Sequence, residues 1–247
     1  MKKAEYARMA EREQTYWWHI GRFRIMESYL GLATRGVDKK KTKILNIGCG
    51  TGGTIKVLEQ FGTVENVDVS VDAIKLMKKA GYSVTKVDGI KLPYKNNSFD
   101  IVGAFDVLEH IDNDVDALKE WQRVLKPGGK VVLTVPAYSW LWSEHDTSLH
   151  HHRRHTRKGV KQRSVEAQLV PKKISYAIVF SLPLVVGFRW LNKLLGRKTD
   201  GETSYVNVPE WVNSIFSNLL FIEAWFHKYI MFPFGTSVVA ILEKKAK

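Results

Sequence analysis

KILNIGCGTGG, residues 43–53, places a short apolar run directly before a loop with glycine at Gly48, Gly50 and Gly52. Glycine has no Cβ atom, so a ligand can approach the backbone closely and the chain can adopt positive φ. A helical pattern follows at once, and the free N–H groups and positive dipole end of that helix face whatever binds. The stretch predicts a strand, a loop and a helix that hold a nucleotide-like ligand. Its Gly-x-Gly-x-Gly spacing differs from the Gly-x-Gly-x-x-Gly of dinucleotide sites.

The composition narrows the class of protein and of partner. The chain has 247 residues, enough for one domain with elaborations, and a net charge of +13. That charge favours an anionic partner: nucleic acid, an acidic lipid surface or a phosphorylated substrate. One cysteine excludes an internal disulfide framework and fits a reducing compartment. The N-terminal stretch lacks the apolar segment of a secretory signal, so a cytoplasmic location is expected.

Apolar runs alternate with helical patterns between residues 42 and 136. We expect strands at 44–48, 63–69, 83–87, 99–105 and 130–135, separated by helices at 53–60, 71–80 and 113–125. This alternation predicts a mostly parallel sheet with helices on both faces. The turn at 126–129 is expected to end one helix and begin the fifth strand.

The two ends of the chain depart from that rhythm. Residues 1–40 are expected to form a helical cap, and residues 41–247 the main domain. A polar loop rich in histidine and arginine is expected at 138–163. The uncharged run 174–188 should divide into a strand and a helix, and an apolar helical insertion is expected at about 181–232, before a last strand at 236–243. Neither apolar stretch is long enough to span a membrane, although the insertion could face a membrane surface.

Acidic residues follow the glycine loop at the ends of successive expected strands. Asp68 ends the second strand, where a carboxylate can accept hydrogen bonds from ribose hydroxyls. Asp88 ends the third strand, and Asp106 follows the fourth. Because the carboxyl ends of parallel strands share one edge, these side chains should surround one ligand.

These motifs resemble the class I S-adenosylmethionine-dependent methyltransferases, in particular the broad type 11 group. The matching stretches are ILNIGCGTGG (44–53), VDVS (67–70), KVDG (86–89), SFDIVGAFDVLEHI (98–111) and LKPGGKVVLTVP (125–136). The resemblance implies an α/β, Rossmann-like, doubly wound sheet of seven mostly parallel strands, the last antiparallel. It implies S-adenosylmethionine as the cofactor, bound by Arg22, Asn46, Gly48, Cys49, Gly50, Asp68, Val69, Asp88, Gly89, Phe105, Asp106 and Val107. Asn46 departs from the acidic residue usual in the group, which predicts weaker cofactor binding.

The acceptor side is less well defined, because an activated sulfonium needs alignment more than a fixed catalytic residue. A general base helps when the nucleophile is a hydroxyl. The candidates are His110, in the Leu-Glu-His motif, and His145, Asp146 and His151, in the polar loop. The candidates for substrate binding are Trp18, Arg153 and Arg154. Paired arginines suit a phosphate or carboxylate. The Leu-Glu-His motif resembles that of quinone O-methyltransferases, where similar residues can hold a metal, but a structural role of His110 is favoured. No metal is expected in the polar loop either, because the adjacent histidines at 150–152 point in different directions.

Three functions remain open on the sequence. The first is methylation, on oxygen, of a small-molecule or lipid-linked acceptor by a cytoplasmic protein that could lie at the inner face of a membrane. The second is methylation of RNA or another nucleic acid, suggested by the net charge of +13 but unsupported by any nucleic-acid-binding motif. The third is a non-catalytic, cofactor-binding protein at a membrane. The oligomeric state stays open.

Overall fold

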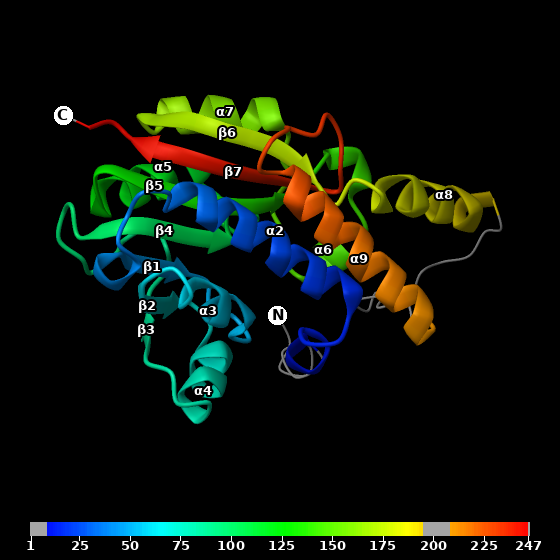
Figure 1. Ribbon diagram of the computed structural model, residues 1–247, viewed down its shortest axis with the longest axis horizontal. Helices are drawn as coiled ribbons and strands as arrows, with labels where there is room; N and C mark the ends of the chain where they lie inside the picture. Colours follow the sequence, from blue (N-terminus) through cyan, green and yellow to red (C-terminus); the bar gives the residue numbers. More distant parts are fainter. Residues whose placement is uncertain (1–8, 195–207, 247) are drawn as a thin grey trace.

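The computed structural model describes residues 9–194 and 208–246, and its centre is one seven-stranded sheet (Figure 1). The strands lie in the order β3-β2-β1-β4-β5-β7-β6. From β1, the chain adds β2 and β3 on one side and then crosses over to add β4 on the other side. All neighbouring pairs are parallel except those of β7, which is antiparallel to β5 and β6. The strands are β1 (Lys43–Ile47), β2 (Thr63–Asp68), β3 (Val84–Lys86), β4 (Phe99–Phe105), β5 (Leu125–Pro136), β6 (Leu169–Ala177) and β7 (Ser237–Lys244). The expected doubly wound sheet is confirmed.

Helices cover both faces of the sheet, because alternate side chains of each buried strand point to opposite faces. On one face, Leu45 and Leu133 pack with α5 (Asp114–Val124) and α7 (Arg157–Glu166). On the other face, Ile44 and Val132 pack with α2 (Trp17–Ala33), α3 (Gly53–Leu58) and α9 (Glu210–Phe226). The short α4 (Val71–Lys79) lies beside β2 and β3. The remaining elements are η1 (Lys39–Lys41), η2 (Leu108–His110), η3 (Ser139–Leu141), α6 (Glu144–Ser148) and α8 (Ser181–Leu194).

Two local expectations are wrong. The fifth strand begins at Leu125, which pairs with Phe99 before the turn at 126–129, and pairing resumes at Lys130 after a register shift. The turn is therefore a bulge within β5, with Gly128 at φ +77°, rather than the start of the strand. The polar segment 138–163 is also more ordered than a loop, since it contains α6 and the start of α7, capped by the Thr156 hydroxyl.

The N-terminal helix α2 and the C-terminal helix α9 lie side by side across the sheet (Figure 1). A Cβ atom on Gly21 would stand 2.0 Å from Leu220, so glycine permits the close approach. The side chain of Asn213 accepts a hydrogen bond from the Trp17 amide at 2.8 Å. The expected insertion at 181–232 is thus represented by α8 and α9, while residues 195–207 lie outside the described residues. Its boundaries, and the division of the chain at residue 40, stay predictions.

Among the described residues, no helix combines the length and the apolar character needed to cross a membrane.

Candidate cofactor and acceptor site

The glycine loop after β1 has the open backbone expected of a ligand cradle. Gly48 and Gly50 have φ values of +72° and +53°. A Cβ atom on Gly48 would lie 2.5 Å from Val107 Cγ2, so only glycine lets the loop pass the chain that follows β4. A Cβ atom on Gly50 would meet no atom within 4 Å, so this part of the loop borders open space. The loop therefore lies against β4 on one side and offers a free backbone on the other.

Asp68 fastens the glycine loop to the end of β2. Its carboxylate accepts hydrogen bonds from the Gly50 amide at 2.9 Å and from the Ser70 amide at 2.8 Å. Ionised acceptors form stronger hydrogen bonds than neutral ones. Asp68 thus holds the loop, and its remaining acceptor capacity is available to ribose hydroxyls. Val69 beside it is 62% exposed and offers an apolar surface at the same edge.

Asn46 and Cys49 are buried beneath the loop rather than exposed on it. The Asn46 amide donates to Asn66 Oδ1 at 3.0 Å and to Thr54 Oγ1 at 3.2 Å, while its own Oδ1 has no hydrogen-bond partner among the described residues. A carboxylate could not donate these bonds, which explains in structural terms why an amide stands at position 46. Burial, and then Asp68, raise the pKa of the Cys49 thiol to about 12, so it is a neutral side chain. Cofactor contacts by both residues stay predictions.

Asp88 and Gly89 lie after β3, on the same edge of the sheet. Asp88 is exposed, and hydrogen bonds from the amides of Lys91 and Ile90 lower the pKa of its carboxyl. Gly89 has φ +78°, and its carbonyl accepts a hydrogen bond from Trp121 Nε1 at 2.9 Å. An ionised carboxylate at a fixed turn fits the expected contact with an adenine amino group.

The helical cap reaches the site through Arg22. Its guanidinium forms an ion pair of 2.6 Å with Asp106 and lies 5.1 Å from the centre of the Trp18 ring. Asp106 has φ +55° and also accepts from Thr134 Oγ1 at 2.9 Å. A non-glycine residue at positive φ is strained, and such residues concentrate at functional sites. Arg22 and Asp106 bind each other here, and their expected contacts with the cofactor stay predictions. Phe105, just before Asp106, is buried in the core.

Glu13 is a residue near the loop that the sequence did not suggest. It is 7% exposed, and its carboxylate accepts a hydrogen bond from the Thr51 hydroxyl of the glycine loop. Burial raises the pKa of Glu13 above its ordinary value. No pattern in the charged N-terminal stretch distinguishes this glutamate from Glu11, which is exposed.

On the acceptor side, Asp146 joins His151 and Arg154. The Asp146 carboxylate is fully buried and contacts His151 Nδ1 at 2.9 Å, Arg154 Nε at 2.7 Å and the second Arg154 nitrogen at 2.9 Å. Burial alone would raise the pKa of Asp146, but the hydrogen bonds from His151 and Arg154 hold it well below its usual range. Because an ionised carboxylate can only accept, His151 donates through Nδ1, and a neutral ring then presents the lone pair of Nε2.

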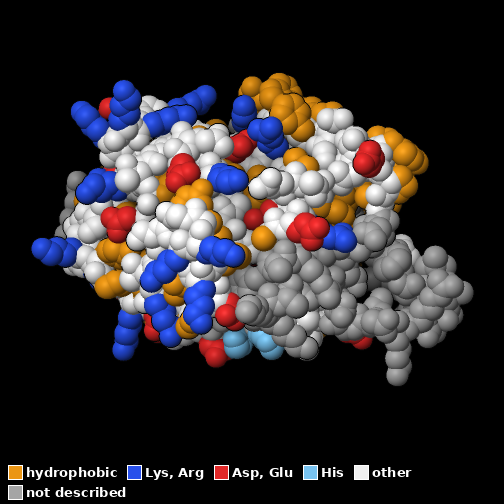
Figure 2. All heavy atoms as spheres, turned by 90° about the horizontal axis from the view of Figure 1, so that it is seen from below, with side chains coloured by type: hydrophobic (Ala, Val, Ile, Leu, Met, Phe, Trp, Pro, Cys, Tyr) orange, Lys and Arg blue, Asp and Glu red, His pale blue; other side chains and the backbone are white. Residues whose placement is uncertain are grey.

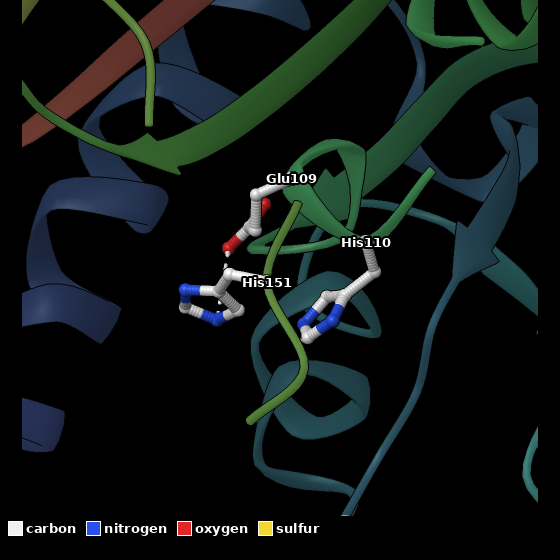
Figure 3. A group of neighbouring side chains, drawn as sticks. All are labelled: Glu109, His110 and His151. Atoms are coloured by element: carbon white, nitrogen blue, oxygen red, sulfur yellow. Dashed lines mark ion pairs between the residues drawn. The ribbon is translucent and has the colours of Figure 1, made fainter. Parts of the chain in front are cut away.

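His151 Nε2 faces two further side chains, those of Glu109 and His110 (Figure 3). We call these three residues, Glu109, His110 and His151, the Glu–His–His cluster. Glu109 and His110 come from η2, directly after Asp106, and His151 comes from the segment after α6. One potential ligand atom from each residue lies within 4.8 Å of the others. Glu109 is fully buried, and burial, then Asp106, raise the pKa of its carboxyl well above its ordinary value. Loss of surrounding water, then His151, lower the pKa of His110 to about 4.

The other acceptor-side candidates lie around this cluster with partners of their own. The guanidinium of Arg154 is bound to Asp146, and that of Arg153 contacts Asp114 at 3.2 Å. Binding of an acceptor phosphate or carboxylate by these arginines stays a prediction, as does a substrate contact by Trp18. His145 is exposed on α6 and is not one of the cluster residues.

His155 should make stability sensitive to acid. His155 is 3% exposed. Burial, and to a smaller extent the positive charge of Arg163, lower the pKa of its imidazole from 6.5 to about 4. The folded state therefore binds fewer protons than the unfolded state between these values, and stability present above pH 6.5 is lost as the pH falls. From pH 6 to pH 5, the wild type should lose about 1 kcal/mol more than His155→Gln. Urea unfolding at both pH values measures the difference, and equal losses would contradict this role of His155.

Comparison with known proteins agrees with this geometry. Residues 45–133 match the Methyltransf_11 family model, described as a methyltransferase domain. A demethylmenaquinone methyltransferase of Staphylococcus aureus is 35% identical over a region covering 42% of this chain and 50% of that protein. The chain spans about half the length of the curated relatives it matches.

Solved structures share the fold over nearly the whole chain. A Haloferax volcanii methyltransferase, in complex with the Trm112 methyltransferase activator, is similar with a TM-score of 0.61 and 16% identity, covering 99% of this chain and 96% of that chain. A SAM-dependent methyltransferase of Archaeoglobus fulgidus gives a TM-score of 0.58 at 17% identity, covering 90% and 94%. The glycine loop and Asp68 thus lie in the region, residues 45–133, that matches a methyltransferase domain. The strand order is that of the class I methyltransferase fold, and this similarity supports S-adenosylmethionine as the cofactor.

Proposed function

We propose that the protein transfers the methyl group of S-adenosylmethionine to an oxygen of a small-molecule or lipid-linked acceptor. The observation that carries the proposal is the position of the Glu–His–His cluster. Glu109 and His110 lie in η2, three and four residues after Asp106, and the charge of Asp106 acts on both of them. Groups suited to an acceptor hydroxyl therefore lie next to residues expected to hold the donor.

Methyl transfer is an in-line displacement at the methyl carbon. The acceptor oxygen forms the new O–CH3 bond with its lone pair, the C–S bond breaks with its electrons going to sulfur, and the hydroxyl proton leaves. The protein contributes alignment, exclusion of water and help with that proton. Asp146 supports removal of the proton, because it fixes the ring of His151 with Nε2 directed at Glu109.

The outer face of α9 supports an apolar or lipid-linked acceptor. Trp211, Phe221 and Trp225 of α9 are 68%, 57% and 50% exposed, and Tyr229, just after the helix, is 67% exposed. Figure 2 shows hydrophobic side chains gathered at the end of the molecule that carries the C-terminal helices, whereas lysines and arginines dominate the opposite end. Exposed aromatic and aliphatic side chains on one helix face suit the interface of a membrane, where an acceptor with a lipid tail would be presented. The protein would then lie at the inner face of the membrane.

Labelled methyl transfer tests the proposal. The full chain is incubated with S-adenosylmethionine carrying a labelled methyl group and with an extract of the source cells, and the label is partitioned between organic, aqueous and macromolecular phases. We expect label in the organic phase, released by treatment that cleaves methyl ethers or esters. Asp68→Ala, which should bind the donor much more weakly, serves as the control and should give far less label at a donor concentration below its Kd.

Other distributions of label would contradict parts of the proposal. Label confined to nuclease-sensitive macromolecules would identify a nucleic-acid methyltransferase, which the net charge of +13 otherwise allows. Donor binding without label in any phase would identify a non-catalytic protein. Label that resists cleavage of methyl ethers and esters would point to methylation on carbon or nitrogen.

A further inference from the structure

We propose that Glu109, His110 and His151 bind a divalent transition-metal ion of the Zn²⁺ class. The three residues provide two imidazole nitrogens and one carboxylate within 4.8 Å of one another. Two histidines and a glutamate form a known ligand set of catalytic zinc, which keeps a further position open for water or substrate. The sequence does not indicate His151 as a ligand beside Glu109 and His110, because it is remote from the Leu-Glu-His motif along the chain.

Glu109 is an independent sign that something is bound at this position. The residue is fully buried, and neither of its carboxylate oxygens has a hydrogen-bond partner among the described residues. Its nearest charged partner in the cluster is His151 Nε2, at 4.0 Å. Burying a carboxylate without hydrogen bonds costs free energy, and protein interiors rarely contain one. A cation between Glu109 and His151 would satisfy it.

His151 has the outer contact that metal-bound histidines usually have. Its Nδ1 contacts Asp146 Oδ1 at 2.9 Å, and Arg154 and the Ser143 amide hold the same carboxylate. A carboxylate on one nitrogen fixes the ring and makes the other nitrogen a better ligand. Asp146 is thus a positioning residue that acts through His151.

The geometry needs only a small closure to hold an ion. Ligand atoms about 2.1 Å from a tetrahedral zinc lie about 3.4 Å apart, compared with 4.0 Å between Glu109 and His151 here. His110 is exposed, and its ring already packs against that of His151, with the ring centres 4.7 Å apart. The same exposure gives an ion a path to the buried carboxylate.

The ion would serve the proposed methyl transfer. An acceptor hydroxyl bound at its open position would have a lowered pKa, so that the proton leaves to water and the oxygen keeps its lone pair for the methyl carbon. This step rests on the proposed function, but binding of the ion does not. Ion binding is therefore measured without donor or acceptor, and methyl transfer separately.

The test uses the untagged full chain, stripped with a chelator and titrated with Zn²⁺ by calorimetry and with Co²⁺ by absorption. We expect one ion per chain and a Co²⁺ spectrum of four- or five-coordination. Glu109→Gln, His110→Ala and His151→Ala should each weaken Zn²⁺ binding at least about 100-fold, the upper range for loss of an outer-shell partner. His110→Ala removes an exposed side chain, so it tests the site even if the other variants fold poorly.

His152→Ala is the matched control. His152 neighbours His151 in the chain, but its ring is exposed and contacts Asp112 at 2.8 Å instead of the cluster. Its removal should leave Zn²⁺ affinity unchanged. Absence of tight Zn²⁺ binding, equal weakening by His152→Ala, or tighter binding of Mg²⁺ than of Zn²⁺ would each overturn the inference. Methyl transfer that persists without ion binding would overturn the role of the ion in the reaction, and would leave both the ion site and the proposed function standing.

Discussion

Asp146→Ala is expected to destabilise the protein by about 3–5 kcal/mol, because it leaves the Arg154 guanidinium without its charged partner. The Arg154 side chain is only 9% exposed, and two of its nitrogens contact the Asp146 carboxylate. An unpaired buried charge costs far more than a pair at the surface gains. Urea unfolding followed by far-UV circular dichroism measures the change.

Two further variants make this prediction specific. Lys119→Ala breaks an exposed ion pair with Asp116, in which the side chains are 56% and 46% exposed, and should cost no more than about 0.5 kcal/mol. Replacing both partners, in Asp146→Ala with Arg154→Met, should be less destabilising than Asp146→Ala alone, since no charge is then stranded. A double variant no better than the single one would mean that the lost hydrogen bonds, and not the stranded charge, set the cost.

Asp68→Ala should weaken binding of S-adenosylmethionine at least about 100-fold, because its carboxylate fixes the loop that holds the donor. Hydrogen bonds to charged groups contribute about 1.5–3 kcal/mol each, and about 1.4 kcal/mol corresponds to a tenfold change in affinity. Asp68 accepts two such bonds, from Gly50 and Ser70, before any ligand is added. Isothermal titration calorimetry with S-adenosylmethionine or S-adenosylhomocysteine measures the loss.

Asp72→Ala controls for charge in the same segment. Asp72 is exposed in the first turn of α4, so its removal changes the net charge equally without touching the loop. Its affinity for the donor should match that of the wild type. A folded Asp68→Ala variant with unchanged affinity would show that the glycine loop keeps its shape without the carboxylate.

The strands that position the cofactor site could be predicted because parallel strands are buried on both faces. Such strands appear in sequence as short, largely apolar runs, and β1 and β4 lie within one residue of their expected bounds. Asp68 could be predicted for the same reason, since the end of a strand fixes the edge at which its side chain lies. The start of β5 could not be predicted, because Leu125 pairs with Phe99 before a turn motif that in sequence marks the end of a helix.

The acceptor side could be predicted only as a set of residue types. Of the neighbouring histidines 150–152, His151 alone belongs to the Glu–His–His cluster, and the choice depends on how the chain leaves α6. Sequence also does not reveal whether an arginine binds a ligand or an internal carboxylate. Arg153 and Arg154 meet Asp114 and Asp146, which lie on other elements of the fold.

The pairing of α2 with α9 has a consequence for biosynthesis. The ribosome makes α2 long before α9, yet the partners of α2 include Leu220 against Gly21 and His227 beside Tyr29. Until α9 emerges, the apolar side of α2 has no complete surface to cover it, and contacts between such distant parts of a chain form slowly. The apolar side of α2 is therefore open to aggregation in the interval between the synthesis of α2 and that of α9.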